Sequence, residues 1–390
     1  MIFISTPYKH TIQMQIIKQN IGINNIRKKY SLQITRRIMR FIGNKEKLAP
    51  IIYDFLQKLE LIKTQKQSFF DVFSGSVSMG KFFRQKGFKV YSSDMLYFSY
   101  VLQKAYLEYK SPSFKKLLPL IEKQSSQNNA FFNTPYEKVL NFLNSLRGVQ
   151  GFISTHYAPS PINARMYFTQ ENAQKIDAMR LQIEQWKNDN HINESEYFIL
   201  LATLLESVSL FANVAGVYAA FCKSWDKRAL KPFSLKPIVF LQGISGKCFC
   251  GDSVKLLQSF KESIDILYLD PPYNQRQYAP NYHLLETLAR YDNPSIKGVA
   301  GMREWGKQKS LFCNTKTALI QLEKIVKLPC YKTLALSYNS DGIMQKDSIF
   351  KLLESFGKVS FYEIPYRRFK SNAKVRKNDV FEYLWVLEKF

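Results

Sequence analysis

The residues with the clearest chemical potential are Asp270, Pro271, Pro272 and Tyr273, which directly follow the mostly apolar run 264–269. The length and composition of that run predict a buried strand, and the two prolines predict that it ends abruptly. Open α/β sheets bind their ligands at the carboxyl ends of strands. We therefore expect the Asp270 carboxylate and the Pro271 carbonyl to accept hydrogen bonds there, with the ring of Tyr273 beside them.

Two acceptors and an aromatic ring suit a planar substrate that carries an exocyclic amino group. The acceptors can take both amine hydrogens while the ring stacks on the substrate, a contact worth about 1–3 kcal/mol per base. An adenine amine is a poor nucleophile because its lone pair is delocalised into the ring. Hydrogen bonds to Asp270 and a proline carbonyl would stabilise the positive charge that develops when it attacks a methyl group. The alternative is a strand that ends in an ordinary Pro-Pro turn with a surface acid.

The tetrapeptide resembles the catalytic motif of S-adenosylmethionine-dependent DNA methyltransferases of the adenine-N6 type. Its continuation over 274–287, which includes Arg276, is similar to that of a subgroup from restriction-modification systems, and the resemblance covers residues 39–390. It implies methyl transfer to an adenine flipped out of double-stranded DNA, DNA binding by Arg276 and a cognate restriction endonuclease as partner. Methylation of RNA or of cytosine N4, or a non-catalytic DNA-binding protein on this fold, are the alternatives. The implied catalytic residues are Asp270, Pro271, Pro272 and Tyr273.

A glycine turn, Phe41–Lys45, precedes a run with apolar residues at helical spacing from Leu48 to Leu59. The resemblance implies that this turn is the family's first cofactor motif, with Lys45 near the methionine end of S-adenosylmethionine. There the lysine would pair with the cofactor carboxylate. An ordinary turn before a helix is the alternative.

The pattern of residues 68–80 predicts a strand, a loop of small residues and a helix in succession. Gly75 in the loop would let the backbone approach a ligand closely, as in nucleotide-cofactor loops. The usual Gly-x-Gly spacing is broken, because Ser76 and Val77 stand where another glycine could sit. Asp71 at the strand end could bind the cofactor's amino group, although an acid that serves only the turn is the alternative.

Two further acids are expected at strand ends. Asp94 follows the predicted strand 88–91 and lies 19 residues after Gly75, where such folds bind ribose hydroxyls, although a dinucleotide enzyme would share this spacing. Asp252 follows another predicted strand, and the resemblance implies that it contacts the cofactor adenine. The expected cofactor-binding residues are Phe41, Gly43, Lys45, Asp71, Phe73, Gly75, Asp94, Asp252 and Asp270.

The 390-residue chain carries 56 lysines and arginines against 31 aspartates and glutamates, a formal net charge of +25. This excess indicates a polyanionic partner bound through phosphates, with a generally lysine-rich proteome as the alternative. Five cysteines without a C-x-x-C pair and four scattered histidines predict no metal site, and an odd cysteine count without a signal peptide fits the cytoplasm. The apolar run 197–222 includes Glu206 and Asn213, so we expect a buried helix rather than a membrane span.

The 176-residue separation of Asp94 and Asp270 is far more than one strand–helix–strand crossover needs. We predict a mostly helical insertion over 101–235, which would recognise the DNA target, within a methyltransferase domain formed by 39–100 and 236–390. One insertion helix would start after an N-cap at Thr169 and bury Ile176, Met179, Ile183 and Trp186.

Both ends of the chain are rich in basic residues. Residues 1–38 hold seven lysines and arginines and no acid, and we expect a DNA-binding arm, a transit-like segment or an extension upstream of a true start at Met39. The segment 366–378, between predicted strands 358–364 and 380–388, holds six basic residues and no acid. We expect phosphate contacts there from Arg367, Arg368 and Lys370.

The order of the motifs, with the cofactor half first and a long insertion before the catalytic half, resembles the alpha arrangement of DNA methyltransferases. It predicts a doubly wound, mostly parallel Rossmann-like sheet with a helical inserted domain. The sequence does not determine the oligomeric state, and a monomer is favoured. A helix over 282–288 is expected to line the cofactor pocket, with His283 in a structural role.

Overall fold

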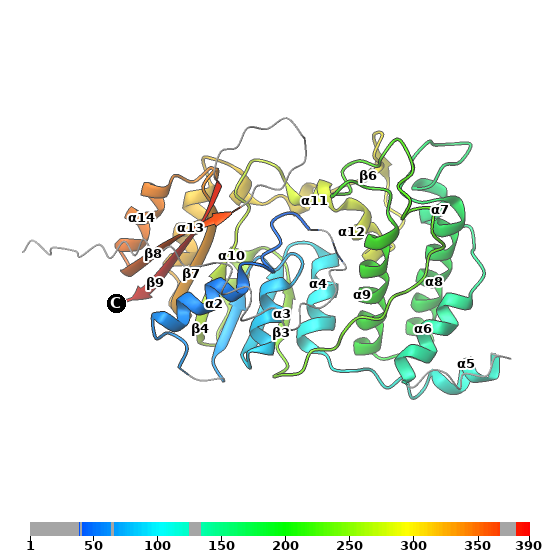
Figure 1. Ribbon diagram of the computed structural model, residues 1–390, viewed down its shortest axis with the longest axis horizontal. Coiled ribbons are helices and arrows are strands. Elements are labelled where there is room, and N and C mark those ends of the chain that lie inside the picture. The colour runs from blue at the N-terminus through cyan, green and yellow to red at the C-terminus, as the bar shows by residue number, and fades with distance from the viewer. Residues whose placement is uncertain (1–38, 40, 64–65, 125–133, 367–379) are drawn as a thin grey trace, which may run out of the picture.

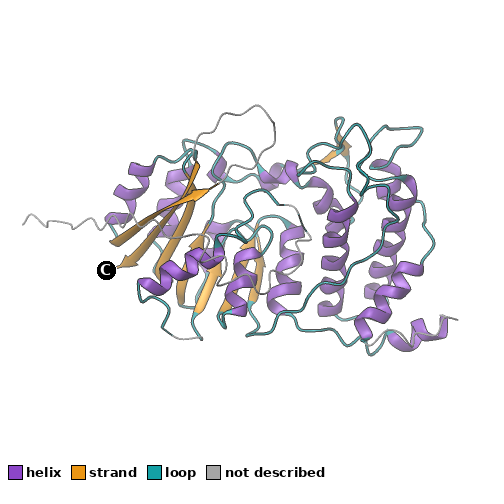
Figure 2. Cartoon of the chain, in the orientation of Figure 1, coloured by secondary structure: helices purple, strands orange, loops and turns teal. Residues whose placement is uncertain are grey.

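The computed structural model describes residues 39, 41–63, 66–124, 134–366 and 380–390. The described part has two regions that lie side by side along the long axis (Figures 1 and 2). A sheet with helices on both faces forms one region, and a group of packed helices forms the other. This architecture confirms the predicted α/β class with a mostly parallel, Rossmann-like sheet.

Seven strands form the sheet in the order β3-β2-β1-β4-β7-β9-β8. The strands from β3 to β7 are parallel to their neighbours, whereas β9 is antiparallel to both β7 and β8. The chain order reverses at β1, next to β4, which makes this the switch point where such sheets bind ligands. The strands are β1 (Ser68–Asp71), β2 (Lys89–Asp94), β3 (Lys247–Cys250), β4 (Ile264–Leu269), β7 (Tyr331–Asn339), β8 (Gly357–Tyr366) and β9 (Val380–Lys389).

Each face of the sheet has its own core, because successive strand residues point to opposite faces. On β4, Ile266 and Tyr268 join one core and Leu267 and Leu269 join the other. A strand buried on both faces needs a nearly continuous apolar sequence, which is what the run 264–269 has. The first face is covered by α2 (Ala49–Lys58), α3 (Ser78–Gln85) and α4 (Tyr97–Gln103), the second by α10 (Ser253–Ser259), α13 (Ala318–Val326) and α14 (Lys346–Glu354) (Figure 1).

Helices α5 to α9 lie between β2 and β3 in the sequence and share the core of α2, α3 and α4. Thr169 is the N-cap of α8, and its hydroxyl accepts a hydrogen bond from the Asn172 N–H at 3.2 Å, as predicted. The four apolar residues predicted to face the core of this helix are all buried. The helices are α5 (Leu118–Gln124), α6 (Pro135–Ser145), α7 (Phe152–His156), α8 (Gln170–Asn188) and α9 (Glu194–Phe211).

Helix α4 continues as a π-helical turn, Lys104–Glu108, so the crossover helix extends past residue 101, where the insertion was expected to begin. Its first turn is held by Glu286 of α12 (His283–Arg290), whose carboxylate accepts from the N–H groups of Tyr97 at 3.2 Å and Phe98 at 3.0 Å. A carboxylate at a helix N-terminus satisfies donors that have no partner within the helix.

Helix α9 is buried along nearly its whole length, as the apolar run predicted, but it ends at Phe211 rather than at residue 222. The amide of Asn213 donates to the carbonyls of Met166 and Cys222, both at 3.0 Å, and so fixes an irregular buried segment after the helix. The predicted helix end is wrong because buried irregular chain and buried helix have the same apolar composition. Within the described part of the chain, no helix combines the length and apolarity needed to cross a membrane.

A short hairpin of β5 (Ile296–Lys297) and β6 (Met302–Arg303) projects beside the insertion. Arg165, from the loop before α8, joins the two. Its guanidinium donates to the carbonyls of Val299 at 3.0 Å, Gly298 at 3.1 Å and His156 at 3.1 Å. One side chain therefore ties a turn of the hairpin to the insertion.

Candidate active site

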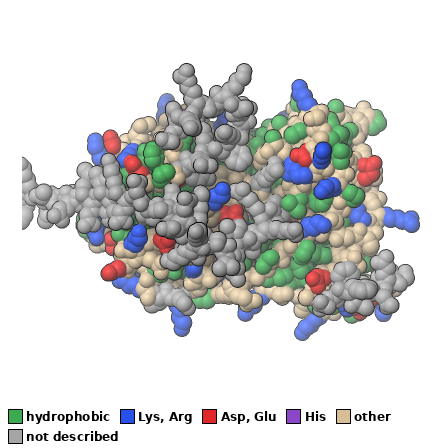
Figure 3. All heavy atoms as spheres, in the orientation of Figure 1, with side chains coloured by type: hydrophobic (Ala, Val, Ile, Leu, Met, Phe, Trp, Pro, Cys, Tyr) green, Lys and Arg blue, Asp and Glu red, His purple; other side chains and the backbone are tan. Residues whose placement is uncertain are grey.

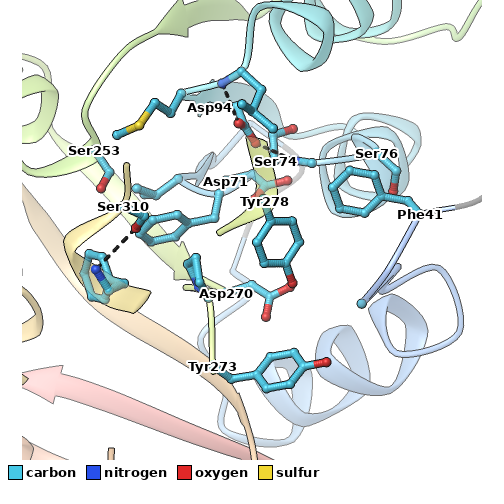
Figure 4. A pocket seen from close by; sticks show the side chains of 18 of the residues that line it. Phe41, Asp71, Ser74, Ser76, Asp94, Ser253, Asp270, Tyr273, Tyr278 and Ser310 are labelled. Atoms are coloured by element: carbon cyan, nitrogen blue, oxygen red, sulfur yellow. Dashed lines mark hydrogen bonds between the residues drawn. The ribbon is translucent and has the colours of Figure 1, made fainter. Parts of the chain in front are cut away.

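The carboxyl ends of β1, β2 and β4 border a pocket that opens to solvent. It brings together residues predicted from distant parts of the sequence, with Asp270 and Tyr273 on one side and Asp94 on another (Figure 4). The predicted residues that line it are Phe41, Gly43, Lys45, Asp71, Phe73, Gly75, Asp94, Asp252, Asp270, Pro272 and Tyr273.

The Asp-Pro-Pro-Tyr corner begins where β4 ends, with Asp270 as the first residue beyond the strand. Pro271 is buried, whereas Pro272 and Tyr273 border the pocket. The corner is held from behind, because the Tyr273 carbonyl accepts from the N–H of Ile343 at 2.9 Å. Two fixed proline φ angles and this bond present Asp270 and Tyr273 on a rigid support.

Lys45 lies beside Asp270, not free in the pocket. Its Nζ is 3.0 Å from Asp270 Oδ1 and 2.8 Å from Glu382 Oε1, and its side chain is 8% exposed. The sequence had assigned this ammonium to the cofactor carboxylate. The structure pairs it with two protein carboxylates, because two acids at this depth need a counter-charge, and Lys45 still borders the pocket.

Burial and neighbouring charges set the protonation of these groups. Burial raises the pKa of Asp270 to about 7, with Lys45 lowering it and Glu382 raising it. Burial by itself would lower the pKa of Lys45, but the charges of Asp270 and Glu382 outweigh burial and raise it well above its ordinary value. Lys45 is therefore a cation, and Asp270 changes its protonation near neutral pH.

Asp71, at the end of β1, is the other unusual acid of the pocket. It is 1% exposed, and neither carboxylate oxygen has a hydrogen-bond partner among the described residues. Burial, Asp270 and Asp94 raise its pKa to about 8, even though the nearby Gly80 N–H and Ser74 hydroxyl act to lower it. Buried polar atoms are normally satisfied, so this orphaned carboxylate points to a ligand with a donor or a positive charge.

Gly75 and Phe41 bring the two predicted cofactor motifs into contact. Gly75 has φ +51°, and a Cβ atom on it would lie 2.6 Å from the ring of Phe41. Phe41 is itself stacked on Tyr282 with ring centroids 4.5 Å apart. Val77 has φ +63°, so the position where the sequence lacked a second glycine does adopt the left-handed conformation.

The two remaining acids connect loops at the rim. Asp94 accepts from the N–H groups of Gly75 at 2.8 Å and Leu96 at 2.9 Å, and burial raises its pKa to about 6. Asp252 is the N-cap of α10 and accepts from the N–H of Lys255 at 3.0 Å. Both therefore have a structural task in addition to the cofactor contacts that the sequence predicted for them.

Several known proteins are similar to this chain in sequence. A family model described as D12 class N6 adenine-specific DNA methyltransferase matches residues 41–329. The chain belongs to this family. It is 37% identical to the type II methyltransferase M.NlaIII of Neisseria lactamica over 90% of the chain and 99% of that protein. M.FokI of Planomicrobium okeanokoites, another type II methyltransferase, is 37% identical over 90% of the chain and 53% of its own length.

The modification methylase StsI of Streptococcus sanguinis is 35% identical over 90% of the chain, which covers 52% of that relative. The chain thus spans about half the length of M.FokI and StsI. These matches confirm the resemblance to adenine-N6 methyltransferases of restriction-modification systems. Membership of this family implies a methyl donor, and the orphaned Asp71 in a glycine-bearing pocket fits a donor that carries an amino group.

Other expected residues of this D12-class chain lie elsewhere. Helix α12 does not line the pocket; the preceding α11 (Tyr278–Asn281) does, and α12 instead packs against α4 and α9. His283 is buried and bonds the Tyr218 carbonyl at 2.7 Å, a structural position. Arg276 is exposed after the corner. Residues 1–38 and Arg367, Arg368 and Lys370 lie outside the described residues.

Two residues at or near the pocket were missed by reasoning from the sequence. Glu382 reaches Lys45 from β9, and its only signal was an acid just before the apolar run 384–387 of that strand. Tyr278 lines the pocket near Asp270 (Figure 4). Burial is the main reason that the pKa of Tyr278 is raised, and the charge of Asp270 raises it further. Tyr278 lies in the continuation after the corner, where its ring was not distinguished from other aromatics.

Proposed function

We propose that this protein transfers a methyl group from S-adenosylmethionine to N6 of an adenine that is flipped out of double-stranded DNA. The observation that carries the proposal is that Asp270 and the orphaned Asp71 border the same pocket at the switch point of the sheet. One acid is placed for an amine on a base, and the other for the amino group of a donor.

On the substrate side, Asp270 would accept one hydrogen of the adenine amine and the Pro271 carbonyl the other, with Pro272 keeping the corner rigid. Tyr273 would stack on the base, as aromatic side chains do on unpaired bases. As N6 gains a bond to carbon it becomes positively charged, and the Asp270 carboxylate stabilises that charge. The methylated amine afterwards loses one proton to water or to Asp270.

On the cofactor side, bound S-adenosylmethionine would supply an electrophilic methyl group. Asp71 would bind its amino group, Asp94 its ribose hydroxyls and Asp252 its adenine, while Gly75 allows the backbone to come close. The remaining residues proposed to contact it are Phe41, Gly43, Lys45, Phe73 and Asp270.

The net charge of +25 supports a polyanionic substrate. We assign phosphate contacts to the exposed Arg276 and to Arg367, Arg368 and Lys370, and target recognition to the insertion over 101–235. The named relatives are type II methyltransferases and modification methylases, so the proposed role is the modification activity of a restriction-modification system with a cognate endonuclease. A cytoplasmic, monomeric enzyme fits this role.

The deciding experiment expresses the protein in a methylation-free host and sequences the DNA by a single-molecule method that identifies modified bases. We expect N6-methyladenine in one sequence context. Asp270→Ala should abolish it while cofactor binding survives, and Tyr273→Phe should retain much more activity than Tyr273→Ala, because stacking needs no hydroxyl. Asp347→Ala, an exposed acid on α14, is the matched control and should behave as wild type.

Other products would redirect the proposal. N4-methylcytosine in the host DNA, or methyl transfer from labelled cofactor to RNA alone, would support another amino-group methyltransferase. Wild-type turnover by Asp270→Ala would refute the assigned mechanism, and no transfer to any nucleic acid would leave a DNA-binding protein.

A further inference from the structure

Glu382 is the second carboxylate on Lys45 and has no role in the mechanism above. It is the third residue of β9, is 2% exposed, and accepts from Lys45 Nζ at 2.8 Å and from the Ser337 hydroxyl at 2.5 Å. It does not border the pocket. Burying an acid inside a strand is costly even when the acid is paired, so stability alone gives no reason for it.

Lys45 has two opposed effects on Asp270. Its charge favours the ionised carboxylate, but its ammonium also occupies Oδ1 and repels the positive charge that develops on N6. Asp270 and Lys45 alone would form a neutral pair. When Asp270 is ionised, the three groups together carry a net charge of about −1, which favours a cation in the pocket.

We propose that Glu382 is a positioning residue for methyl transfer. It holds the Lys45 ammonium from the side away from the pocket, so that Asp270 keeps free acceptor capacity and a negative field for the adenine amine. An ammonium has three N–H donors, and the Ser337 hydroxyl fixes the carboxylate that receives one of them. The inference rests on the proposed function, because it takes the adenine amine as the group that meets Asp270.

The charged groups around Asp270 determine in which direction each substitution should shift its pKa. Burial raises the pKa of Asp270, Lys45 lowers it and Glu382 raises it. Neutralising Glu382 should therefore lower this pKa, whereas removing Lys45 should raise it. Three further groups interact with the Asp270 charge: Asp71 on β1, Tyr268 on β4 and Tyr278 on α11.

The test compares Glu382→Gln, Lys45→Met and the double variant with Glu388→Gln. Glu388 is the matched control, because it lies on the same strand and pairs with Lys358 at 3.6 Å, away from the pocket. Single-turnover methylation of a duplex target is measured as a function of pH, and the affinities for the duplex and for the cofactor are measured separately.

Glu382→Gln should slow the single-turnover rate by about 10- to 100-fold with little change in either affinity, the range seen when a supporting residue is lost. The acid limb of its pH–rate profile, which follows the ionisation of Asp270, should move to lower pH. The acid limb of Lys45→Met should move to higher pH. The double variant should be no slower than Lys45→Met alone, because Glu382 acts through Lys45. Glu388→Gln should match the wild type.

A Glu382→Gln enzyme with the wild-type rate and acid limb would overturn the inference. So would a double variant whose loss equals the product of the two single losses. If Glu382→Gln does not fold, Glu382→Asp decides: it keeps the charge but shortens the reach, so its rate should fall without the shift of the acid limb to lower pH, and a wild-type rate overturns the inference.

Failure of the proposed function gives a different result. A wild-type enzyme that leaves adenine unmethylated would refute that function, whichever variant is compared. The titration of Asp270, followed by carbon-13 NMR of its carboxyl group, would still report whether Glu382→Gln lowers its pKa.

Discussion

Asp71 and Asp270 border the same pocket, but only one of them has a protein counter-charge. Asp270 has the Lys45 ammonium at 3.0 Å, whereas both oxygens of the buried Asp71 have no hydrogen-bond partner among the described residues. A buried acid without partners destabilises the fold, so its position is explained by a ligand rather than by folding. This contrast predicts opposite roles for Asp71 in stability and in binding.

Asp71→Asn should raise the free energy of unfolding of the ligand-free protein and weaken its binding of the methyl donor. The folded-state pKa of Asp71, about 8, lies above the ordinary value of 3.8, so the folded state favours its protonated form. Wild-type stability therefore falls as pH rises from the ordinary pKa to about 8, and the gain in Asp71→Asn should grow over that window. We expect about 1–3 kcal/mol at the alkaline end, measured by urea unfolding.

Asp265→Asn is the comparison variant, because the pKa of Asp265 is shifted in the opposite direction to that of Asp71. Burial would raise the pKa of Asp265, but hydrogen bonds from Lys332 and Ser68 outweigh it and lower the pKa. This substitution should reduce stability at neutral pH, with the loss disappearing as pH falls through the lowered pKa. A decrease in stability at alkaline pH for Asp71→Asn would contradict the role given to Asp71.

At the scale of elements, the hairpin β5–β6 depends on a neighbour for its position. A two-residue strand pair has little stability of its own. The Arg165 guanidinium supplies hydrogen bonds to two carbonyls of its turn and one to the carbonyl of His156 at the end of α7. The position of the hairpin is therefore set by the insertion.

Arg165→Ala should loosen the turn without unfolding the domain. Losing these charge-assisted bonds should speed amide hydrogen exchange over 298–301 by about 10-fold or more, while exchange in β4 stays unchanged. Arg303→Ala is the control, because Arg303 of β6 pairs with Asp292, which precedes β5, and its loss leaves the Arg165 contacts intact. Equal exchange in Arg165→Ala and wild type would mean that other contacts hold the turn, such as the Tyr157 and Tyr167 hydroxyls that donate to the carbonyls of Gly301 and Ala300.

Elements whose signals are local were predictable from the sequence, and contacts across the sheet were not. The end of β4 at Asp270 and the Thr169 cap each follow from a few adjacent residues. The partners of Lys45 depend on β9 lying next to β7, a pairing between segments that are both more than 280 residues from Lys45 in the sequence. Sequence position gives no measure of such a distance, so Glu382 was missed.

At the scale of the whole molecule, the question is where the excess positive charge acts. Lysines and arginines are spread over the face seen in Figure 3, while apolar side chains gather over the helical region. Net charge alone would attract DNA to any face. The catalytic corner, however, lies at one edge of the sheet, so a productive complex needs cations at that edge.

The segment 367–379 is joined to the sheet at this edge, although it lies outside the described residues. Tyr366 ends β8 and Val380 begins β9, and the two are paired; because β9 is antiparallel to β7, both lie at the carboxyl edge where Asp270 stands. The segment 109–116 follows the crossover helix at the opposite edge, where the Leu107 carbonyl accepts from the Gly246 N–H before β3.

These two edges give a matched pair of triple variants. Replacing Arg367, Arg368 and Lys370 with alanine should weaken binding to every duplex and flatten the slope of log affinity against log salt by about 2–3 units, because each lost phosphate contact contributes about 0.9. The methylated sequence should not change, since phosphate contacts carry no base information. The second triple variant replaces the exposed residues Lys110, Lys115 and Lys116 with alanine. It removes the same charge from the opposite edge, so its salt slope should stay near that of the wild type. If both triple variants flatten the salt slope equally, net charge rather than its position controls DNA binding. If the first triple variant methylates a different target sequence, the segment 367–379 contacts bases rather than phosphates alone.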